Sequence, residues 1–353
     1  MLVYLYVVIA TFLILLIPIQ SNRGYQIKLI CSFIPLYLFG ALRVDFGFDY
    51  SGYEEQFYDI NSYSDWKKVN DHSEIGYLLL QRIIPSWRLL IAFQSLLVCI
   101  AYYILFYKYI PRKHIVLAFI LLFLTGDKTI FFMFSAIRNS IAISLFLLSI
   151  PLIIEKRTVL YVCLSVLAMQ FHTSAILVMP LMYIICYKNN FDRRSLLTAC
   201  IIILFIIMTP VDRLVVLITP FMNDYFSRYD SYLETFSGMG DTRTVLVYFS
   251  SMFFLYCIFI NIYRNKIDRT TLCLFLLAII TPLAPLLGTL NGRLSYYGTL
   301  FFILAVIKIF NSNNMKFRRG LLCFTFAYMG YAFFKVFMGN PLFPYKIYHS
   351  ILE

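Results

Sequence analysis

The chain has 353 residues, of which 61% are apolar and only 14% are charged, and its mean hydropathy is +0.78. Soluble domains are about 45–50% apolar and about 25% charged, so this composition excludes a soluble globular protein. The formal net charge of +12 would suit a nucleic-acid-binding protein, but the placement of the charges argues against that class. The sequence therefore predicts an all-α, polytopic integral membrane protein.

Apolar runs separated by charged clusters predict about 12 transmembrane helices in a single membrane domain, residues 1–353. Several runs are shorter than the ~20 residues that cross a ~30 Å hydrocarbon core. We therefore expect short or broken spans around an outward-facing cavity. The predicted spans are 1–19, 27–42, 88–107, 114–125, 130–154, 158–171, 173–187, 195–209, 245–262, 271–288, 294–310 and 320–338.

The connecting loops form two alternating sets that differ in charge. The first set has 17 basic and 3 acidic residues in about 45 positions, and the second has 13 basic and 15 acidic residues in about 118. Basic loops remain cytoplasmic, so the second set and both termini are predicted to face outward. The first set is 21–28, 108–114, 155–157, 188–194, 263–270 and 308–319; the second is 43–88, 125–138, 210–243, 289–293 and 335–353.

The eight cysteines lie inside apolar runs without the spacing of metal ligands, which indicates packing residues. No phosphate-binding loop, zinc-protease motif or serine-hydrolase motif occurs. The sequence therefore predicts no metal and no cofactor.

The outward segment 43–87 is acidic and aromatic, with Arg43 directly after a predicted span. If the segment is helical, Asp45 and Asp49 share a face with Tyr53. Two interpretations remain open. The segment is either a solvated acidic loop, or a site that binds sugar through carboxylates and rings, Tyr50 included, and phosphate through arginine.

Arg138 lies eight residues into the predicted span 130–154, about 12 Å along a helix. A charge at that depth costs about 2.5 kcal/mol or more unless it meets a partner or a wet cavity. Arg138 therefore either reaches the outer headgroups or binds an anion.

His172 lies in a stretch, 158–187, that is too short for two crossings although basic clusters flank both ends. The chain is therefore expected to turn back below the outer surface near His172. Such a histidine is either a hydrogen-bonded structural group or a general base.

Arg293 is predicted to lie in a short outward turn, 289–293. Together with Arg43 and Arg138, it would bring three positive charges to one cavity. A diphosphate is the ligand that such a cluster suits.

The outward segment 210–243 carries aromatic residues at three- and four-residue steps, which is typical of an amphipathic interfacial helix. It is either an aromatic belt or a lid that stacks on sugar rings. Segments 43–87 and 210–243 are the expected cover of the active site.

Several short motifs, in this order, resemble the EpsG/Wzy-type family of bacterial polysaccharide polymerases. They are Leu42-Arg43, Gly47-x-Asp49-Tyr50-x-x-Tyr53, Glu74-x-Gly76-Tyr77, Ile137-Arg138-x-x-Ile141-Ala142, Phe171-His172-x-Ser174-Ala175, Arg293-x-x-x-Tyr297 and Pro344-Tyr345.

The resemblance implies a periplasmic glycosyltransferase in the bacterial inner membrane that joins undecaprenyl-diphosphate-linked repeat units without a metal. The implied partners are this lipid-linked glycan, membrane lipid, a chain-length regulator and a flippase. Arginine would stabilise the leaving diphosphate. The expected roles are His172 as first-ranked base, Glu74 and Asp49 as acceptor-positioning groups, Arg43, Arg138 and Arg293 on the diphosphate, and Asp45, Tyr50, Tyr53 and Tyr297 on sugar.

Two other functions stay open at this point. A flippase of lipid-linked oligosaccharide would also need an outward basic cavity, but it should carry polar residues through the inner half of the spans, whereas the embedded charges lie outward. A membrane acyltransferase that modifies sugars would use His172 with a carboxylate.

Overall fold

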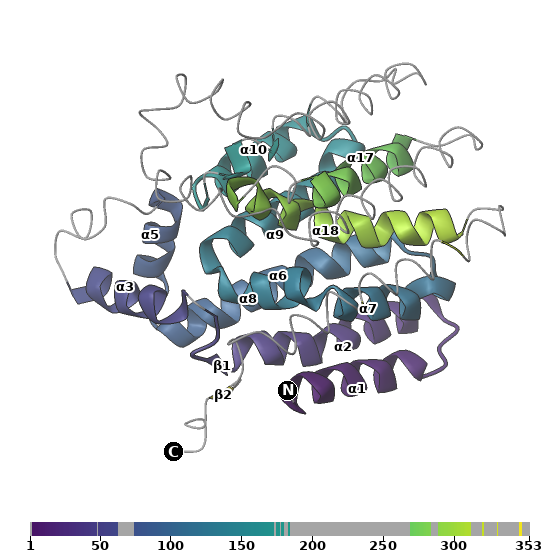
Figure 1. Ribbon diagram of the computed structural model, residues 1–353, viewed down its shortest axis with the longest axis horizontal. Helices are drawn as coiled ribbons and strands as arrows, with labels where there is room; N and C mark the ends of the chain where they lie inside the picture. Colours follow the sequence, from purple (N-terminus) through teal and green to yellow (C-terminus); the bar gives the residue numbers. More distant parts are fainter. Residues whose placement is uncertain are drawn as a thin grey trace, which may run out of the picture. The chain divides into compact units, whose positions relative to one another are not determined.

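The computed structural model describes residues 2–47, 49–62, 74–172, 174–176, 178–179, 183, 269–283, 289–311, 320, 330 and 346–347 (Figure 1). The chain divides into two compact units, Met1–Pro180 with Thr325–Glu353, and Leu181–Phe324. The predicted spans 195–209 and 245–262, nearly all of 320–338, and the predicted lid 210–243 lie outside the described residues.

The described part of the first unit is almost entirely helical, as the sequence predicts. Its helices are α1 (Leu2–Leu16), α2 (Asn22–Ala41), α3 (Tyr50–Ser62), α5 (Ile75–Ile83), α6 (Trp87–Tyr109), α7 (Ile115–Leu124), α8 (Phe132–Ser135), α9 (Ile137–Ile154) and α10 (Thr158–Met169). A 3₁₀ turn (Arg112–His114) precedes α7, and a π-helical turn (Asp127–Phe131) follows it. The second unit contributes α17 (Arg269–Leu283) and α18 (Thr289–Phe310).

Three described helices, α2, α6 and α9, are long and apolar enough to cross a membrane. The segment around α7 and α8 passes the same test only as a bent pair, which would make a fourth. The chain is thus a helical membrane protein, while the predicted count of about 12 spans is not confirmed.

The two long helices α2 and α6 begin at serine caps, which explains their boundaries. Ser21 accepts a hydrogen bond from the Gly24 backbone N–H at 3.0 Å, and Ser86 accepts one from Leu89 at 3.3 Å. Each cap satisfies one of the N–H groups that a helix start leaves without an internal partner.

The described basic loops gather at one end of the helices. Lys108, at the end of α6, forms an ion pair with Glu155, just after α9, and Gln26 near the start of α2 donates to Tyr107 at 2.6 Å. The hydrogen bond and positive charge of Lys108 lower the pKa of Glu155. The segments α3 and α5 lie at the opposite end (Figure 1). Within the first unit, the described parts of the two loop sets that charge separates in the sequence are therefore also separate in space.

The predicted span 130–154 is not one helix, which corrects the sequence interpretation. Inside this span the chain breaks at Ala136 (φ −89°, ψ 77°) before α9 starts. The 84° bend between α7 and the segment Thr129–Ser135 falls where the predicted spans 114–125 and 130–154 separate. Buried polar groups satisfy the broken backbone: Tyr102 donates to the Thr129 carbonyl at 2.6 Å, and the Thr129 hydroxyl donates to Leu122 at 2.9 Å. Irregular backbone inside a membrane protein is tolerated where protein supplies such partners.

Despite this break, helix α9 begins at a deeper level in the bundle than the neighbouring helix α6 does. Gln94 is seven residues into α6, about 10 Å from its start. Its amide nitrogen donates to the Met133 carbonyl at 2.5 Å and to the Ser140 hydroxyl at 2.6 Å. Arg138, two residues before Ser140 in the first turn of α9, therefore lies about 7 Å, or between one and two helical turns, below the start of α6.

The segment before α3 is not helical, contrary to one expectation. Residues Arg43–Val44 form β1, which pairs antiparallel with β2 (Lys346–Ile347). Asp45 has φ 51° and Gly47 has φ 99°, so the chain turns sharply before α3 begins at Tyr50. Asp45 therefore does not share a helical face with Asp49 and Tyr53. A Cβ on Gly47 would lie 2.1 Å from the Ser135 hydroxyl, which fixes this turn against α8.

The predicted reversal near His172 is confirmed. Helix α10 ends at Met169, and the following residues run back beside it, since Tyr161 donates to the Met179 carbonyl at 2.5 Å. At 12 residues, α10 is about 18 Å long, too short for a full crossing.

Candidate functional site: an arginine, a glutamate and a histidine at the end of the helices

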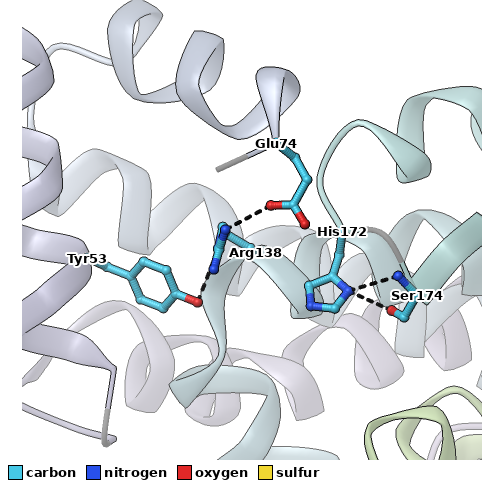
Figure 2. Close-up of polar contacts among 5 residues, drawn as sticks. All are labelled: Tyr53, Glu74, Arg138, His172 and Ser174. Atoms are coloured by element: carbon cyan, nitrogen blue, oxygen red, sulfur yellow. Dashed lines mark hydrogen bonds and ion pairs between the residues drawn. The ribbon is translucent and has the colours of Figure 1, made fainter. Parts of the chain in front are cut away.

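Arg138 and Glu74 form an ion pair at the end of the helices that carries α3 and α5. Arg138 Nη1 lies 2.8 Å from Glu74 Oε2, and Arg138 Nε donates to the Tyr53 hydroxyl at 3.4 Å (Figure 2). The guanidinium also stacks 5.5 Å from the centre of the Tyr53 ring. The arginine side chain is 26% exposed and the glutamate side chain 16%, so the pair is sheltered but still partly exposed. Such a guanidinium can bind an anion that reaches it.

Glu74 reaches Arg138 because its side chain does not cap its own helix. Glu74 is the N-cap residue of α5, and its carboxylate makes no capping hydrogen bond. Two residues on, the Gly76 N–H donates to the Gln170 carbonyl at 2.9 Å. A Cβ on Gly76 would lie 2.6 Å from the Gln170 Cβ, so only glycine lets α5 approach this turn so closely. This contact places Glu74 beside the turn that carries His172.

His172 is 8% exposed and is held by Ser174 from the same turn. Its Nδ1 lies 2.7 Å from the Ser174 hydroxyl and 3.1 Å from the Ser174 backbone nitrogen, which donates to it. The Ser174 hydroxyl also lies 3.5 Å from Asn139 Oδ1, next to Arg138 on α9. In Figure 2 the Glu74 carboxylate lies between Arg138 and the imidazole. The structure thus brings together three predicted site residues, Glu74, Arg138 and His172, with Tyr53 beside them.

Arg43 occupies a different environment from Arg138. Its side chain is fully buried, and its guanidinium donates to Gln94 Oε1 at 2.8 Å, to the Ser95 hydroxyl at 2.9 Å and to the Gly40 carbonyl near the end of α2. It also lies 5.5 Å from the centre of the Phe134 ring. These contacts are those of a residue that joins α2 to α6.

Tyr77 lies within electrostatic range of both arginines. It is fully buried, and burial raises the pKa of its hydroxyl. Its ring packs edge-on against Tyr53, 5.7 Å between centres. Arg43 and Arg138 therefore approach one side chain, although only Arg138 is partly exposed.

The acidic and aromatic residues before α6 divide into exposed and buried groups. Asp45 and Asp49 are exposed, whereas Tyr50 is buried and accepts a hydrogen bond from the Trp87 indole at 3.0 Å. Glu54 is half-buried, and burial raises the pKa of its carboxyl, with repulsion from Asp45 adding to the shift and Arg88 opposing it. In this conformation the carboxylates, but not Tyr50, are accessible to a sugar.

Arg293 and Tyr297 belong to the second unit. Both lie in α18, which starts at Thr289, so Arg293 is helical and not in the predicted turn 289–293. Tyr297 is fully buried. The side chain of Arg293 lies outside the described part of the chain, and the predicted convergence of three arginines stays a prediction.

Ser174 and Gln94 were not among the sequence-predicted site residues. The spacing His172-x-Ser174 was a signal for the first, because a serine two residues on can reach the imidazole. Gln94 gave no such signal, since its partners lie on β1, α8 and α9. Among the residues that the structure describes, no group of three or more His, Cys, Asp or Glu could hold a metal ion.

No curated protein and no solved structure matches this chain. The model of the EpsG family matches residues 26–347, which covers nearly all of the sequence and includes every residue of the site. The chain therefore belongs to the EpsG family.

Proposed function

We propose that this protein is a polysaccharide polymerase, a glycosyltransferase that joins undecaprenyl-diphosphate-linked repeat units at the periplasmic face of the bacterial inner membrane. The growing glycan leaves its lipid diphosphate and bonds to a hydroxyl of the next lipid-linked unit. Membership of the EpsG family supports the polymerase-type function. The observation that carries the proposal is the sheltered, partly exposed Arg138–Glu74 pair beside His172.

The pair suits this reaction for a physical reason. Negative charge develops on the diphosphate as the glycosidic bond breaks, and a fixed guanidinium in a partly dry site stabilises it. We propose that the diphosphate binds Arg138 in place of the Glu74 carboxylate, without a metal ion. One of the ionisable side chains Glu74 and His172 then accepts the proton of the acceptor hydroxyl. The exposed Asp45 and Asp49 are proposed to position the sugar, beside the half-buried Tyr53.

The test of function is the lipid-linked glycan profile of a deletion strain. We expect only the one-unit product to remain, with the full ladder restored by the wild-type gene. Loss of every surface unit would indicate a flippase instead, and a normal ladder that lacks an acyl group would indicate an acyltransferase. Purified protein should also lengthen a lipid-linked unit in the presence of a chelator; dependence on a divalent ion would refute the metal-free part of the proposal.

The proposed orientation gives a second prediction. Ser51, on α3, and Lys113, before α7, are both exposed and belong to the two different loop sets. A membrane-impermeant thiol reagent applied from the periplasm should label Ser51→Cys and not Lys113→Cys, each measured against the parent protein with its native cysteines. Labelling of Lys113→Cys alone would place the site in the cytoplasm and contradict a periplasmic reaction.

A further inference from the structure

The hydrogen bonds of His172 determine which ring nitrogen carries the proton. A backbone N–H can only donate, so the 3.1 Å contact from the Ser174 nitrogen makes Nδ1 an acceptor. The Ser174 hydroxyl lies 2.7 Å from the same atom and 3.5 Å from Asn139 Oδ1, and it can donate its one proton to either acceptor. A neutral imidazole with an unprotonated Nδ1 carries its hydrogen on Nε2.

The Nε2 edge of the ring faces away from Ser174, on the side of Arg138 and Tyr53 (Figure 2). Two contacts hold the His172 turn beside the helices that carry Arg138 and follow Glu74: Ser174 lies 3.5 Å from Asn139 on α9, and the Gly76 N–H on α5 donates to the Gln170 carbonyl. An Nε2–H in this position is a hydrogen-bond donor. A general base would need a free lone pair there.

We propose that Ser174 holds His172 in the Nε2–H tautomer, so that His172 donates a hydrogen bond to the substrate while Glu74 accepts the proton of the acceptor hydroxyl. This assignment reverses the order expected from the ordinary pKa values of the two side chains. It rests on the proposed glycosyl transfer, and it makes Ser174 a positioning residue.

The reaction balances with these groups alone. The acceptor oxygen forms a bond to the anomeric carbon as its proton moves to the Glu74 carboxylate. The bond from that carbon to the diphosphate oxygen breaks, and its electron pair leaves with the diphosphate. Arg138 and the Nε2–H of His172 stabilise the charge that appears there. Binding of the diphosphate to Arg138 also releases Glu74 from its ion pair, which frees the carboxylate at the moment it is needed.

The tautomer can be measured without any activity. Protein labelled with ¹⁵N-histidine in lipid nanodiscs, at a pH about two units above the ordinary histidine pKa of about 6.5, gives distinct signals for protonated and unprotonated ring nitrogens. The His172 signals are found among the four histidines by comparison with His172→Gln. We expect an unprotonated Nδ1. A protonated Nδ1 in the wild-type protein would overturn the proposal even if the protein is a polymerase.

Variants of Ser174 test its positioning role by the same signal. Ser174→Ala removes the hydroxyl but keeps the backbone N–H that donates to Nδ1, so it should increase the Nδ1–H tautomer only in part and slow polymerisation several-fold. Ser174→Thr, which keeps both donors, should resemble the wild type. Ser165→Ala is the matched control, because its hydroxyl bonds the Tyr161 carbonyl in the same hairpin. An unchanged tautomer in Ser174→Ala, with unchanged rate, would remove Ser174 from the proposal.

The roles of His172 and Glu74 are separated by amide replacements. A glutamine amide reaches the position of the imidazole Nε2 and can still donate, whereas an asparagine amide reaches only the position of Nδ1. We expect the polymerisation rate to fall by less than ~10-fold in His172→Gln but by ~10²–10³-fold in His172→Asn. Glu74→Gln should lower the polymerisation rate by ~10²–10⁴-fold, and the rate of Glu74→Asp should lie between those of Glu74→Gln and the wild type. Equal large losses for both histidine variants, with an active Glu74→Gln, would show that His172 is the base.

Discussion

Replacing Arg138 with leucine is expected to lower the polymerisation rate by ~10²–10³-fold, because the leaving diphosphate loses its charged donor. Arg138→Lys should recover little of this rate. A lysine ammonium keeps the charge, but it cannot present two nitrogens at the angle that now serves Glu74 at 2.8 Å and Tyr53 at 3.4 Å. The measurement is glycan length and initial rate in protein shown to be folded and inserted.

Tyr53→Phe is the matched control for the arginine variants. It removes only the hydroxyl, whose 3.4 Å contact with Arg138 is long for a strong hydrogen bond, and it keeps the ring under the guanidinium. We therefore expect a change of less than ~5-fold, since a weak neutral contact contributes less than about 1 kcal/mol. Wild-type polymerisation by Arg138→Leu would show that Arg138 only reaches toward the headgroups.

Replacing Arg43 with methionine is expected to destabilise the protein itself, by roughly 2–4 kcal/mol. The change removes the donor of Gln94 Oε1 and the Gly40 carbonyl, and each unsatisfied buried acceptor costs about 1–3 kcal/mol. The Ser95 hydroxyl also loses Arg43 but keeps its bond to the Ile91 carbonyl. The relief from burying one charge fewer opposes this loss, so we take the lower part of the summed range. The measurement is the midpoint of thermal unfolding in detergent, without substrate.

Arg157→Met provides the comparison for Arg43. Its side chain is 62% exposed and contacts Glu155 at 3.3 Å, so its loss should change stability by no more than about 0.5 kcal/mol. A stable but inactive Arg43→Met would favour the sequence-based expectation that Arg43 binds the diphosphate. Lowered stability with activity retained at low temperature would favour the structural role that its burial indicates.

The residues of the site could be named from the sequence, but their pairing could not. Burying a charged or titratable group among apolar residues costs free energy, so Arg138 and His172 stand out in a hydropathy profile of the sequence. Glu74 stood out only through the family resemblance. That Glu74 binds Arg138 depends on the close approach of Gly76 to Gln170, a contact between residues 94 positions apart. No local pattern encodes such a contact.

The break before α9 shows the same limit. The apolar run from 130 to 154 predicts one helix, because hydropathy is averaged over residues that are adjacent in the sequence. Ala136 is a good helix former and gives no sign of a break. The chain breaks there because Gln94 and Tyr102 of α6 supply hydrogen bonds to Met133 and Thr129. These partners come from another helix, so their effect appears only after packing.

The sequence by itself determined the membrane class, the helical character, the separation of basic from acidic loops, the reversal near His172 and the family resemblance. Each of these follows from composition, charge or the order of motifs, which are local or additive properties. Only the tertiary structure decided that Arg43 is buried while Arg138 is partly exposed, and that Ser174 donates to His172 Nδ1. Arg43 directly follows one predicted span and Arg138 lies inside another, and hydropathy does not tell which of the two is buried. Their environments differ because burial and hydrogen-bond direction are set by which side chains meet in space.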